Sequence, residues 1–180
     1  MEGRVEVYCG QGRGKTSCAI GQCVKAAGQE KQIIMVQFLK GKETEELSFF
    51  KRLEPEVQLF RFEKYERSYE ELSDEEKKEQ DHFIYNGLKY AHKVIDTRQC
   101  DVVVLDEVLG LLDLGLLKTE ELVEMLENRS DDQLIIMTGR QIPDELIPYT
   151  DAVYCICIRN QCFWNLPSCH DDRLVITTIF

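Results

Sequence analysis

The feature that most constrains the fold of this 180-residue chain is a glycine-rich turn between an apolar strand and a helix. The turn lies in the stretch YCGQGRGKTSC, from Tyr8 to Cys18, and follows the apolar segment Arg4–Cys9. A helix is expected over Lys15–Gly28, where Gly28 is suited to end it. Backbone N–H groups and the positive end of the helix dipole then meet at one point, which favours a bound phosphate group. The order of strand, glycine turn and helix therefore predicts a phosphate-binding loop, or P-loop.

The ending of this loop, Gly14-Lys15-Thr16, matches the usual G-x-x-x-x-G-K-[ST] pattern, but Cys9 holds the slot of the first glycine. Lys15 is expected to contact the phosphate chain and Thr16 to supply a hydroxyl to Mg²⁺, which makes both candidate catalytic residues. The candidate nucleotide-binding residues of the loop are Gly10, Gln11, Gly12, Arg13, Gly14, Lys15, Thr16 and Ser17. The alternative is a glycine turn without a ligand, but G-x-G-K-[ST] between a strand and a helix rarely arises by chance.

Apolar strands alternate with helical segments along the rest of the chain. Strands are expected at Gln32–Leu39, Val57–Phe62, Asp101–Asp106, Gln133–Thr138 and Ala152–Ile158. Helices are expected from Ser73 to about Arg98, over Thr119–Asn128 and over Pro143–Pro148. Strands that are apolar throughout favour a mostly parallel sheet with helices on both faces. With no internal repeat or linker, residues 1–180 are expected to form a single α/β domain of the P-loop NTPase-like (RecA-like) class.

Two acidic residues follow the clearest buried strand, in the stretch VVVLDE. Asp106 and Glu107 thus stand at the carboxyl end of a strand, where ligands bind in open α/β sheets. A carboxylate there can hold Mg²⁺ directly or through water. Surface acids at the end of a strand would give the same pattern, but together with the P-loop the pair predicts a magnesium site made of Thr16, Asp106 and Glu107, and a nucleoside triphosphate as ligand.

Net charge and apolar content exclude several classes of partner and location. The net charge of −11 argues against a nucleic-acid partner, because phosphate contacts need clustered lysine and arginine. The sequence contains no apolar run of ~20 residues, so no membrane span is expected. The first residues, Met1-Glu2-Gly3-Arg4, lack the apolar segment of an export signal, and a cytoplasmic location is expected.

The chain contains eight cysteines, which in this setting are expected to be reduced and mostly buried thiols. Cys155, Cys157, Cys162 and Cys169 with His170 are an alternative soft-metal cluster. Their spacing contains neither a C-x₂-C nor an H-x₃₋₅-H pair, which favours free thiols.

Several motifs together resemble one family, the ATP:corrinoid adenosyltransferases. GQGRGKTS matches position for position the family's G-N-G-K-G-K-T-T loop, whose first P-loop position is also usually not glycine. The resemblance continues through VQFLKG (Val36–Gly41), VVVLDE (Val102–Glu107), the GLLDLGLL that follows, and TGR (Thr138–Arg140) with its trailing PDELI. It covers residues 4–153 in the same order and with similar spacing, whereas residues 155–180 do not align.

The resemblance implies transfer of the 5′-deoxyadenosyl group of ATP to the cobalt(I) of a reduced corrinoid, with release of triphosphate, in adenosylcobalamin biosynthesis or salvage. It implies ATP and Mg²⁺ as cofactors, a cob(I)alamin or precursor as substrate, an electron-donating reductase or flavoprotein, and a homodimer. It adds Arg140 to the nucleotide-binding residues and makes Gln37 and Lys40 candidate corrinoid contacts. The family's Phe and Trp pair near the corrinoid has no counterpart here, and Tyr65 and Tyr69 are the candidates in its place.

Two other functions stay open at this point. A P-loop ATP hydrolase or ATP-driven regulator would use Glu107 to position a water. A nucleotide- or corrinoid-binding module without catalysis would also fit the missing tryptophan and the unaligned end. The inorganic product separates the three: triphosphate, ADP with phosphate, or none.

Overall fold

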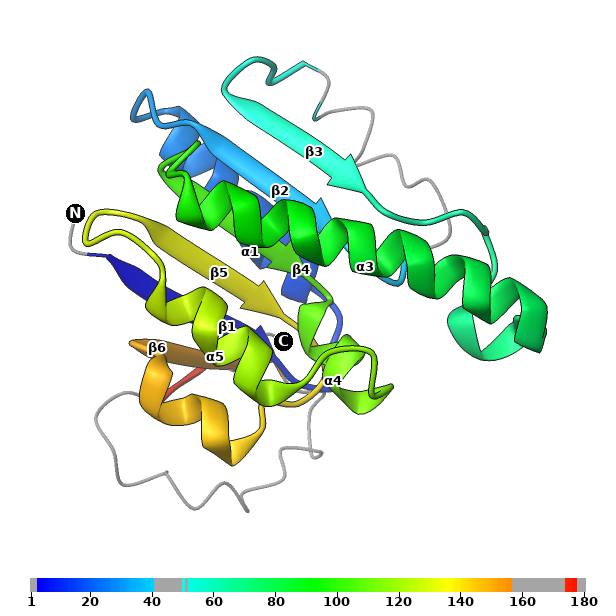
Figure 1. Ribbon diagram of the computed structural model, residues 1–180. Helices are drawn as coiled ribbons and strands as arrows, with labels where there is room; N and C mark the ends of the chain where they lie inside the picture. Colours follow the sequence, from blue (N-terminus) through cyan, green and yellow to red (C-terminus); the bar gives the residue numbers. More distant parts are fainter. Residues whose placement is uncertain (1–2, 41–49, 51, 157–173, 178–180) are drawn as a thin grey trace.

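The computed structural model describes residues 3–40, residue 50, residues 52–156 and the backbone of residues 174–177. These residues form one seven-stranded sheet in the order β3-β2-β4-β5-β1-β6-β7, and every neighbouring pair of strands is parallel (Figure 1). The strands are β1 (Arg4–Cys9), β2 (Ile33–Gln37), β3 (Val57–Arg61), β4 (Val102–Asp106), β5 (Leu134–Thr138), β6 (Ala152–Ile156) and β7 (Leu174–Thr177). The expected parallel sheet is confirmed.

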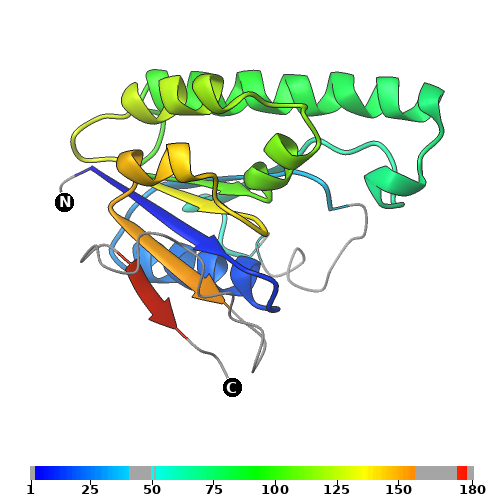
Figure 2. The same ribbon diagram turned by 90° about the horizontal axis from the view of Figure 1, so that it is seen from below.

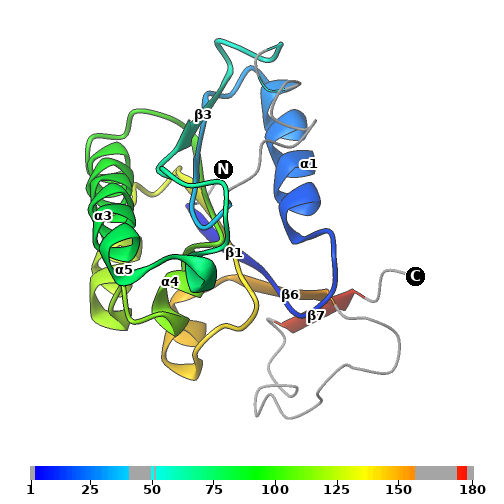
Figure 3. The same cartoon turned by 90° about the vertical axis from the view of Figure 1, so that its right-hand side faces the viewer.

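Helices cover both faces of the sheet. They are α1 (Lys15–Ala27), α3 (Asp74–Asp96), α4 (Val108–Asp113) and α5 (Thr119–Glu127), with the 3₁₀ turns η1 (Tyr69–Glu71) and η2 (Asp144–Tyr149). Figure 3 shows α1 on one face and α3, α4 and α5 on the other. Figure 2 shows the long helix α3 running along its face of the sheet, with β7 at the far edge.

The core lies in two layers because successive side chains of a strand point to opposite faces. In β2, Ile34 and Val36 pack in the layer under α3 and α5, while Ile33 and Met35 pack in the layer under α1. Every residue of β2, β4 and β5 is buried, which explains why these strands read as apolar runs without alternation.

The start of α3 agrees with its sequence signal. Ser73 is the N-cap, its hydroxyl accepts from the N–H of Glu76, and the Glu76 carboxylate accepts the N–H of Ser73 in return. The buried face of the helix includes Ile84, Leu88 and Ala91, at helical spacing. This reciprocal cap fixes the direction in which the chain leaves the segment that precedes α3.

Three elements were not expected from the sequence: α4, η1 and β7. The stretch VLGLLD forms α4, and because its first four residues are all buried, it shows no amphipathic period. The expected strand Ala152–Ile158 is described as far as Ile156, while Cys157, Cys162, Cys169 and His170 lie outside the described residues.

Three of the described cysteines, Cys18, Cys23 and Cys100, are free thiols. Burial raises the pKa of the Cys23 and Cys100 thiols to about 12 in each case. These two thiols are therefore protonated and unreactive at neutral pH.

The topology brings the carboxyl ends of β1, β2, β4 and β5 to the same edge of the sheet. β1 carries the P-loop and β4 ends in Asp106, and β5 lies between these two strands. None of the helices in the described part of the chain combines the length and the apolar composition that a bilayer span requires. The single-domain organisation of residues 1–180 stays a prediction.

Candidate functional site

The P-loop turn takes its shape from glycines with a positive φ, a backbone conformation that a side chain would strain. Gly10 has a φ of 118°, and a Cβ at this position would lie 2.3 Å from the carbonyl oxygen of Ile156. Gly14, with a φ of 108°, is the N-cap residue of α1. Cys9, in the slot of the usual first glycine, is the last residue of β1. Because the positive φ falls on Gly10, Cys9 keeps its strand conformation and leaves the turn undisturbed.

Backbone hydrogen bonds tie the turn to the ends of neighbouring strands. The Gly10 N–H donates to the carbonyl oxygen of Arg140 at 2.9 Å, and the Gly12 N–H donates to that of Ile156 at 2.8 Å. These two donors are thus engaged within the protein. The first N–H groups of a helix lack intrahelical acceptors, and in α1 they belong to the turn after Gly14. An anion at this place would be held mainly by the start of α1.

Lys15 folds back over the loop that precedes it. Its Nζ donates to the carbonyl oxygens of Gly10 and Gly12, at 2.9 Å each. The ammonium group therefore stands at the mouth of the loop, half-buried. The other polar side chains of the loop are exposed: Gln11, Arg13 and Ser17.

Asp106 is the centre of a buried polar network, and its side chain is fully inaccessible to solvent. Thr16 Oγ1 and Thr138 Oγ1 donate to its Oδ1 at 3.0 and 2.7 Å. Gln37 Nε2 donates to Oδ2 at 2.8 Å, and Lys40 Nζ lies 3.1 Å from the same oxygen. A buried carboxylate is stable only when its oxygens are paired in this way. The network links P-loop, β2, β4 and β5 through one side chain.

Glu107 follows Asp106 and lines the adjoining cavity. It is the N-cap of α4, with a φ of 61°, in the left-handed region. Burial of its carboxyl raises the pKa of Glu107, and the neighbouring charge of Asp106 adds to this. The positive charges of Lys15, Lys40 and Arg140 act in the opposite direction. Glu107 is therefore a carboxyl group held among cations at the edge of the sheet.

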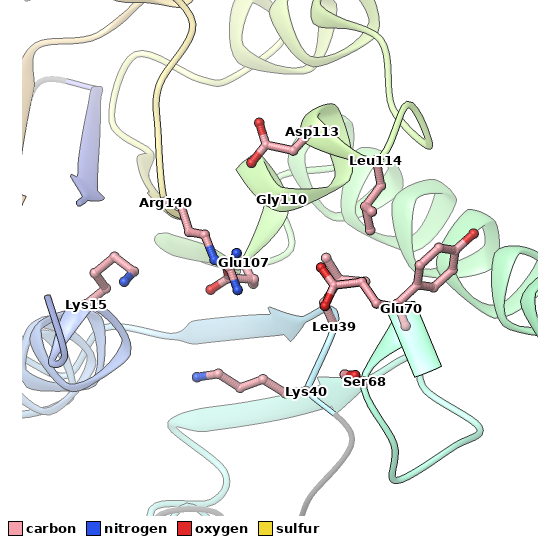
Figure 4. Close-up of a pocket in the computed structure, with 11 residues that line it drawn as sticks. Lys15, Leu39, Lys40, Ser68, Glu70, Glu107, Gly110, Asp113, Leu114 and Arg140 are labelled. Carbon is pink, nitrogen blue, oxygen red and sulfur yellow. The ribbon is translucent and has the colours of Figure 1, made fainter. Parts of the chain in front are cut away.

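A cavity of about 360 Å³ opens between the P-loop and the segment before α3. Lys15, Lys40 and Arg140 line it and group around Glu107 (Figure 4). On the side away from Lys15 its wall includes Ser68, Glu70 and Leu114. The cavity therefore has a cationic end at the P-loop and a mixed polar and apolar end at the opposite wall.

The candidate corrinoid contacts Gln37 and Lys40 lie in different places. Gln37 is almost fully buried, and its amide lies against Asp106, away from the lining of the cavity. This placement favours a positioning role for Gln37 over a direct corrinoid contact. Lys40 lines the cavity, with its ammonium on Asp106.

The two candidate tyrosines also differ. Tyr69 lines the cavity, and its hydroxyl donates to Asp81 Oδ1 at 2.6 Å. Burial, followed by the bond to Asp81, raises the pKa of Tyr69 to about 12. Tyr65 lines a smaller neighbouring pocket that it shares with Tyr69, and its hydroxyl donates to the exposed side chain of Glu79. Only Tyr69 of the pair thus reaches the main cavity.

The donor set at the end of β4 fits a magnesium ion that is shared with phosphate. The described residues contain no group of three or more His, Cys, Asp or Glu side chains placed to hold a metal. The Thr16 hydroxyl and the Asp106 carboxylate adjoin each other as hard oxygen donors. Mg²⁺ is commonly held by one or two protein oxygens together with substrate phosphates and waters. These two residues are the candidate ligands, with Glu107 next to them.

One residue of the network was not singled out from the sequence. Thr138 is fully buried, and its hydroxyl also accepts the N–H of Glu107 at 2.8 Å. It therefore fixes both acids at the end of β4. The available signal was a polar residue that ends the apolar strand LIIMT, next to the glycine and arginine of TGR.

The overall arrangement resembles a solved structure of a different protein. The flagellar accessory protein FlaH from Methanocaldococcus jannaschii aligns with 86% of this chain and 71% of its own, with a TM-score of 0.54 and 13% sequence identity. At this identity the likeness concerns the fold alone. The predicted P-loop NTPase-like α/β fold is confirmed.

Proteins that are similar in sequence indicate the family more specifically than the fold does. The corrinoid adenosyltransferases of Escherichia coli K12 and Pseudomonas aeruginosa PAO1 are 29% and 30% identical, over 84% and 82% of this chain and 74% and 71% of their own lengths. An uncharacterised protein of Nostoc sp. PCC 7120 is 29% identical over 84% of this chain, which spans 43% of that protein. The family model for ATP:corrinoid adenosyltransferase BtuR/CobO/CobP matches residues 1–162. Since that match spans nearly the whole chain, the protein belongs to the ATP:corrinoid adenosyltransferase family.

Proposed function

We propose that the protein transfers the 5′-deoxyadenosyl group of ATP to the cobalt(I) of a reduced corrinoid and releases triphosphate, in adenosylcobalamin biosynthesis or salvage. The observation that carries this proposal is the convergence of Lys15, Lys40 and Arg140 on one cavity beside the start of α1. A leaving group with several negative charges needs this concentration of positive charge. Family membership supplies the corrinoid as the second substrate.

The proposed reaction is a displacement at the ribose 5′-carbon. Cobalt(I) donates an electron pair to this carbon, the carbon–oxygen bond breaks, and triphosphate leaves with the bonding pair. The cobalt becomes formally cobalt(III), bonded to carbon, and no proton has to be removed from the nucleophile. The protein therefore needs to hold the two substrates in line and to stabilise the leaving group.

Each candidate residue has a role in this scheme. Lys15 and the N–H groups at the start of α1 would hold the triphosphate, and Arg140 would contact it from the end of β5. Thr16 and Asp106 would hold Mg²⁺, with Glu107 beside it. When bound there, Mg²⁺ neutralises part of the triphosphate charge. Tyr69, at the opposite wall, is the proposed corrinoid contact, with Tyr65 as a more distant candidate.

A second function, ATP hydrolysis, has one observation in its favour. Glu107 lines the cavity directly after Asp106, and burial raises its pKa, as is suitable for a group that accepts a proton from water. Against this, the carboxyl is surrounded by Lys15, Lys40 and Arg140, which favour its ionised form and lower its basicity.

The direct test is incubation of the protein with ATP, Mg²⁺ and chemically reduced cob(I)alamin, followed by the optical spectrum. Conversion to the spectrum of an adenosylated corrinoid is expected, whereas a spectrum that shows only reoxidised corrinoid would contradict the proposal. The substitution Lys25→Ala, on an exposed position of α1, is a matched control that should leave the rate unchanged. The homodimer, the electron-donating reductase or flavoprotein and the cytoplasmic location stay predictions. A sedimentation experiment that finds only active monomer would dispose of the dimer.

A further inference from the structure

One ammonium group lies on the two oxygens that are proposed to hold the metal. Lys40 Nζ donates to Thr16 Oγ1 and lies 3.1 Å from Asp106 Oδ2. Thr16 Oγ1 in turn donates to Asp106 Oδ1 at 3.0 Å. The Thr16 hydroxyl thus donates a hydrogen bond to Asp106, and its oxygen lone pair accepts a hydrogen bond from the Lys40 ammonium.

A divalent cation needs the same lone pair of Thr16 and the same carboxylate of Asp106. A hydroxyl oxygen that accepts a hydrogen bond from an ammonium group presents less electron density to a metal. A monovalent and a divalent cation within a few ångströms of one another also repel strongly in a buried site. Lys40 and the metal therefore exclude each other from this position.

The backbone of Lys40 is held while its side chain can move. The carbonyl oxygen of Lys40 accepts a hydrogen bond from the Arg61 guanidinium, and Leu39 before it has a φ of 53°. The side chain itself lines the open cavity, together with Lys15 and Arg140. Four methylene groups on a fixed backbone let the ammonium leave Asp106 and enter the cavity without a change of fold.

We propose that the Lys40 ammonium occupies the metal position of the nucleotide-free protein, and that a divalent metal with a polyphosphate displaces it into the cavity, where it pairs with the phosphate chain. This inference rests on the proposed function for the identity of the incoming ligand. In the resting protein Lys40 is the counter-ion that keeps the fully buried Asp106 from being an uncompensated charge. In the loaded protein its ammonium contacts the triphosphate directly.

The exchange between the Lys40 ammonium and the metal makes metal binding depend on the nucleotide. A free divalent ion would have to displace Lys40 with nothing to receive the ammonium, and would therefore bind weakly. A polyphosphate supplies both a new partner for Lys40 and additional ligands for the metal. The device thus couples metal binding to the arrival of the nucleotide.

The experiment measures Mn²⁺ binding to the whole chain by electron paramagnetic resonance, first without nucleotide. Lys40→Met and Lys40→Gln should bind Mn²⁺ about tenfold more tightly than wild type, because the metal no longer competes with a charge-assisted hydrogen bond. Lys40→Arg, which keeps the charge, should stay near wild type. Lys25→Met, on the exposed side of α1, carries the same change of charge and should also stay near wild type.

A double variant tests whether the gain in Mn²⁺ affinity depends on Asp106. A measurement with ATP tests whether the Lys40 ammonium moves to the phosphate chain. Adding Asp106→Asn to Lys40→Met should abolish the gain, because the metal then lacks its carboxylate. With ATP present, the gain of Lys40→Met should disappear or reverse, since the wild-type lysine then contacts phosphate.

The results separate this inference from the proposed function. Equal or weaker Mn²⁺ affinity of both Lys40→Met and Lys40→Gln without nucleotide, in variants whose circular dichroism matches wild type, would overturn the inference. So would a gain that persists in the double variant with Asp106→Asn. The nucleotide-free measurement uses neither ATP nor corrinoid, so a failure of adenosyl transfer would leave its result unaffected.

Discussion

The two ends of the cavity differ in how their side chains are held. At the P-loop end, Asp106 is fully buried, and donors from three other segments converge on it. At the opposite end, which we call the distal rim (residues 64–71), the contacts include ion pairs at the surface. Lys64 lies 2.6 Å from Glu79, and both side chains are about half exposed (43% and 53%). Arg67 pairs with Glu76 in a similar setting.

This difference has a physical cause. The P-loop end is built on the carboxyl ends of parallel strands, whose positions are fixed by the sheet and the core. The distal rim is a loop with one 3₁₀ turn, and exposed ion pairs contribute little to its order because water screens them. We infer that the P-loop end provides preorganised charge for the triphosphate, whereas the distal rim adapts to the larger substrate.

The largest effect is expected at the P-loop end, from Lys15→Ala. Loss of a charge-assisted contact to the leaving group should reduce the rate about a hundredfold, or ~3 kcal/mol in the transition state. The fold should persist, since the two lost hydrogen bonds are to loop carbonyls. Initial rates with saturating substrates measure the effect, with a thermal melt as the check on folding. Wild-type turnover in this variant would remove the loop from the mechanism.

The next effect in size is expected from Asp106→Asn. The metal should bind about thirtyfold more weakly, or roughly 2 kcal/mol, whereas nucleotide should bind nearly as before because the start of α1 still holds the phosphates. Titration of Mg²⁺ at fixed ATP measures the first quantity, and equilibrium dialysis of ATP without metal measures the second. If the variant and wild type show the same magnesium affinity, Asp106 is structural.

Glu63 lies between the two ends, and the pH dependence of the free energy of unfolding tests whether its carboxyl is buried. Burial raises its pKa from 4.5 to about 7, and Arg61 beside it opposes this. The protonated form is therefore favoured by folding. The stabilisation is complete below about pH 4.5 and is lost as the pH rises through about 7.

Glu63→Gln should remove this dependence. Relative to wild type, its free energy of unfolding should rise by about 1.3 kcal/mol between pH 6 and pH 8. Urea melts over this range measure the difference. Glu79→Gln, on the exposed pair of the distal rim, is the control and should show no such trend. Parallel curves for Glu63→Gln and wild type would mean that the Glu63 carboxyl is not buried in solution.

A smaller effect is expected from Glu107→Gln. Cobalt(I) carries no proton to be removed, so adenosyl transfer should slow by only about threefold. A general base for water would instead contribute about a hundredfold or more. Parallel assays of adenosyl transfer and of ATP consumption distinguish these outcomes. A loss of a hundredfold in both assays would favour hydrolysis.

The smallest effect is expected at the distal rim. Tyr69→Ala should raise the KM for the corrinoid about threefold, because the ring lines the cavity, and should leave the KM for ATP unchanged. Tyr65→Ala should change neither, since Tyr65 does not reach the main cavity. An equal rise for both variants would extend the corrinoid surface to the smaller pocket.

The P-loop end was also the part that the sequence made predictable. Buried parallel strands and the glycine turn leave local signals, and the first acid of VVVLDE, Asp106, accepts a hydrogen bond from the Thr16 hydroxyl. The bonds that Gln37 and Thr138 make with Asp106 depend on strand order, which local patterns do not encode. Helix α4 was missed because Val108–Leu111 are all buried and show no helical period.

The distal rim was less predictable for a related reason. From the sequence, Tyr65 and Tyr69 were equal candidates for a corrinoid contact. In the structure, the turn η1 and the contact with Asp81 bring only Tyr69 to the main cavity. A loop position is set by contacts with distant residues, in this case with α3. The sequence shows which residue types are present in the distal rim, but it does not show which of their side chains point into the cavity.

The central claim is that cobalt, and not water, is the nucleophile toward ATP at the P-loop end. The most direct measurement is the inorganic product of ATP with Mg²⁺, assayed with and without chemically reduced cob(I)alamin. We expect negligible ATP turnover without the corrinoid, and triphosphate in equal amount to the adenosylated corrinoid when it is present. Steady release of ADP and phosphate in corrinoid-free buffer would contradict the account.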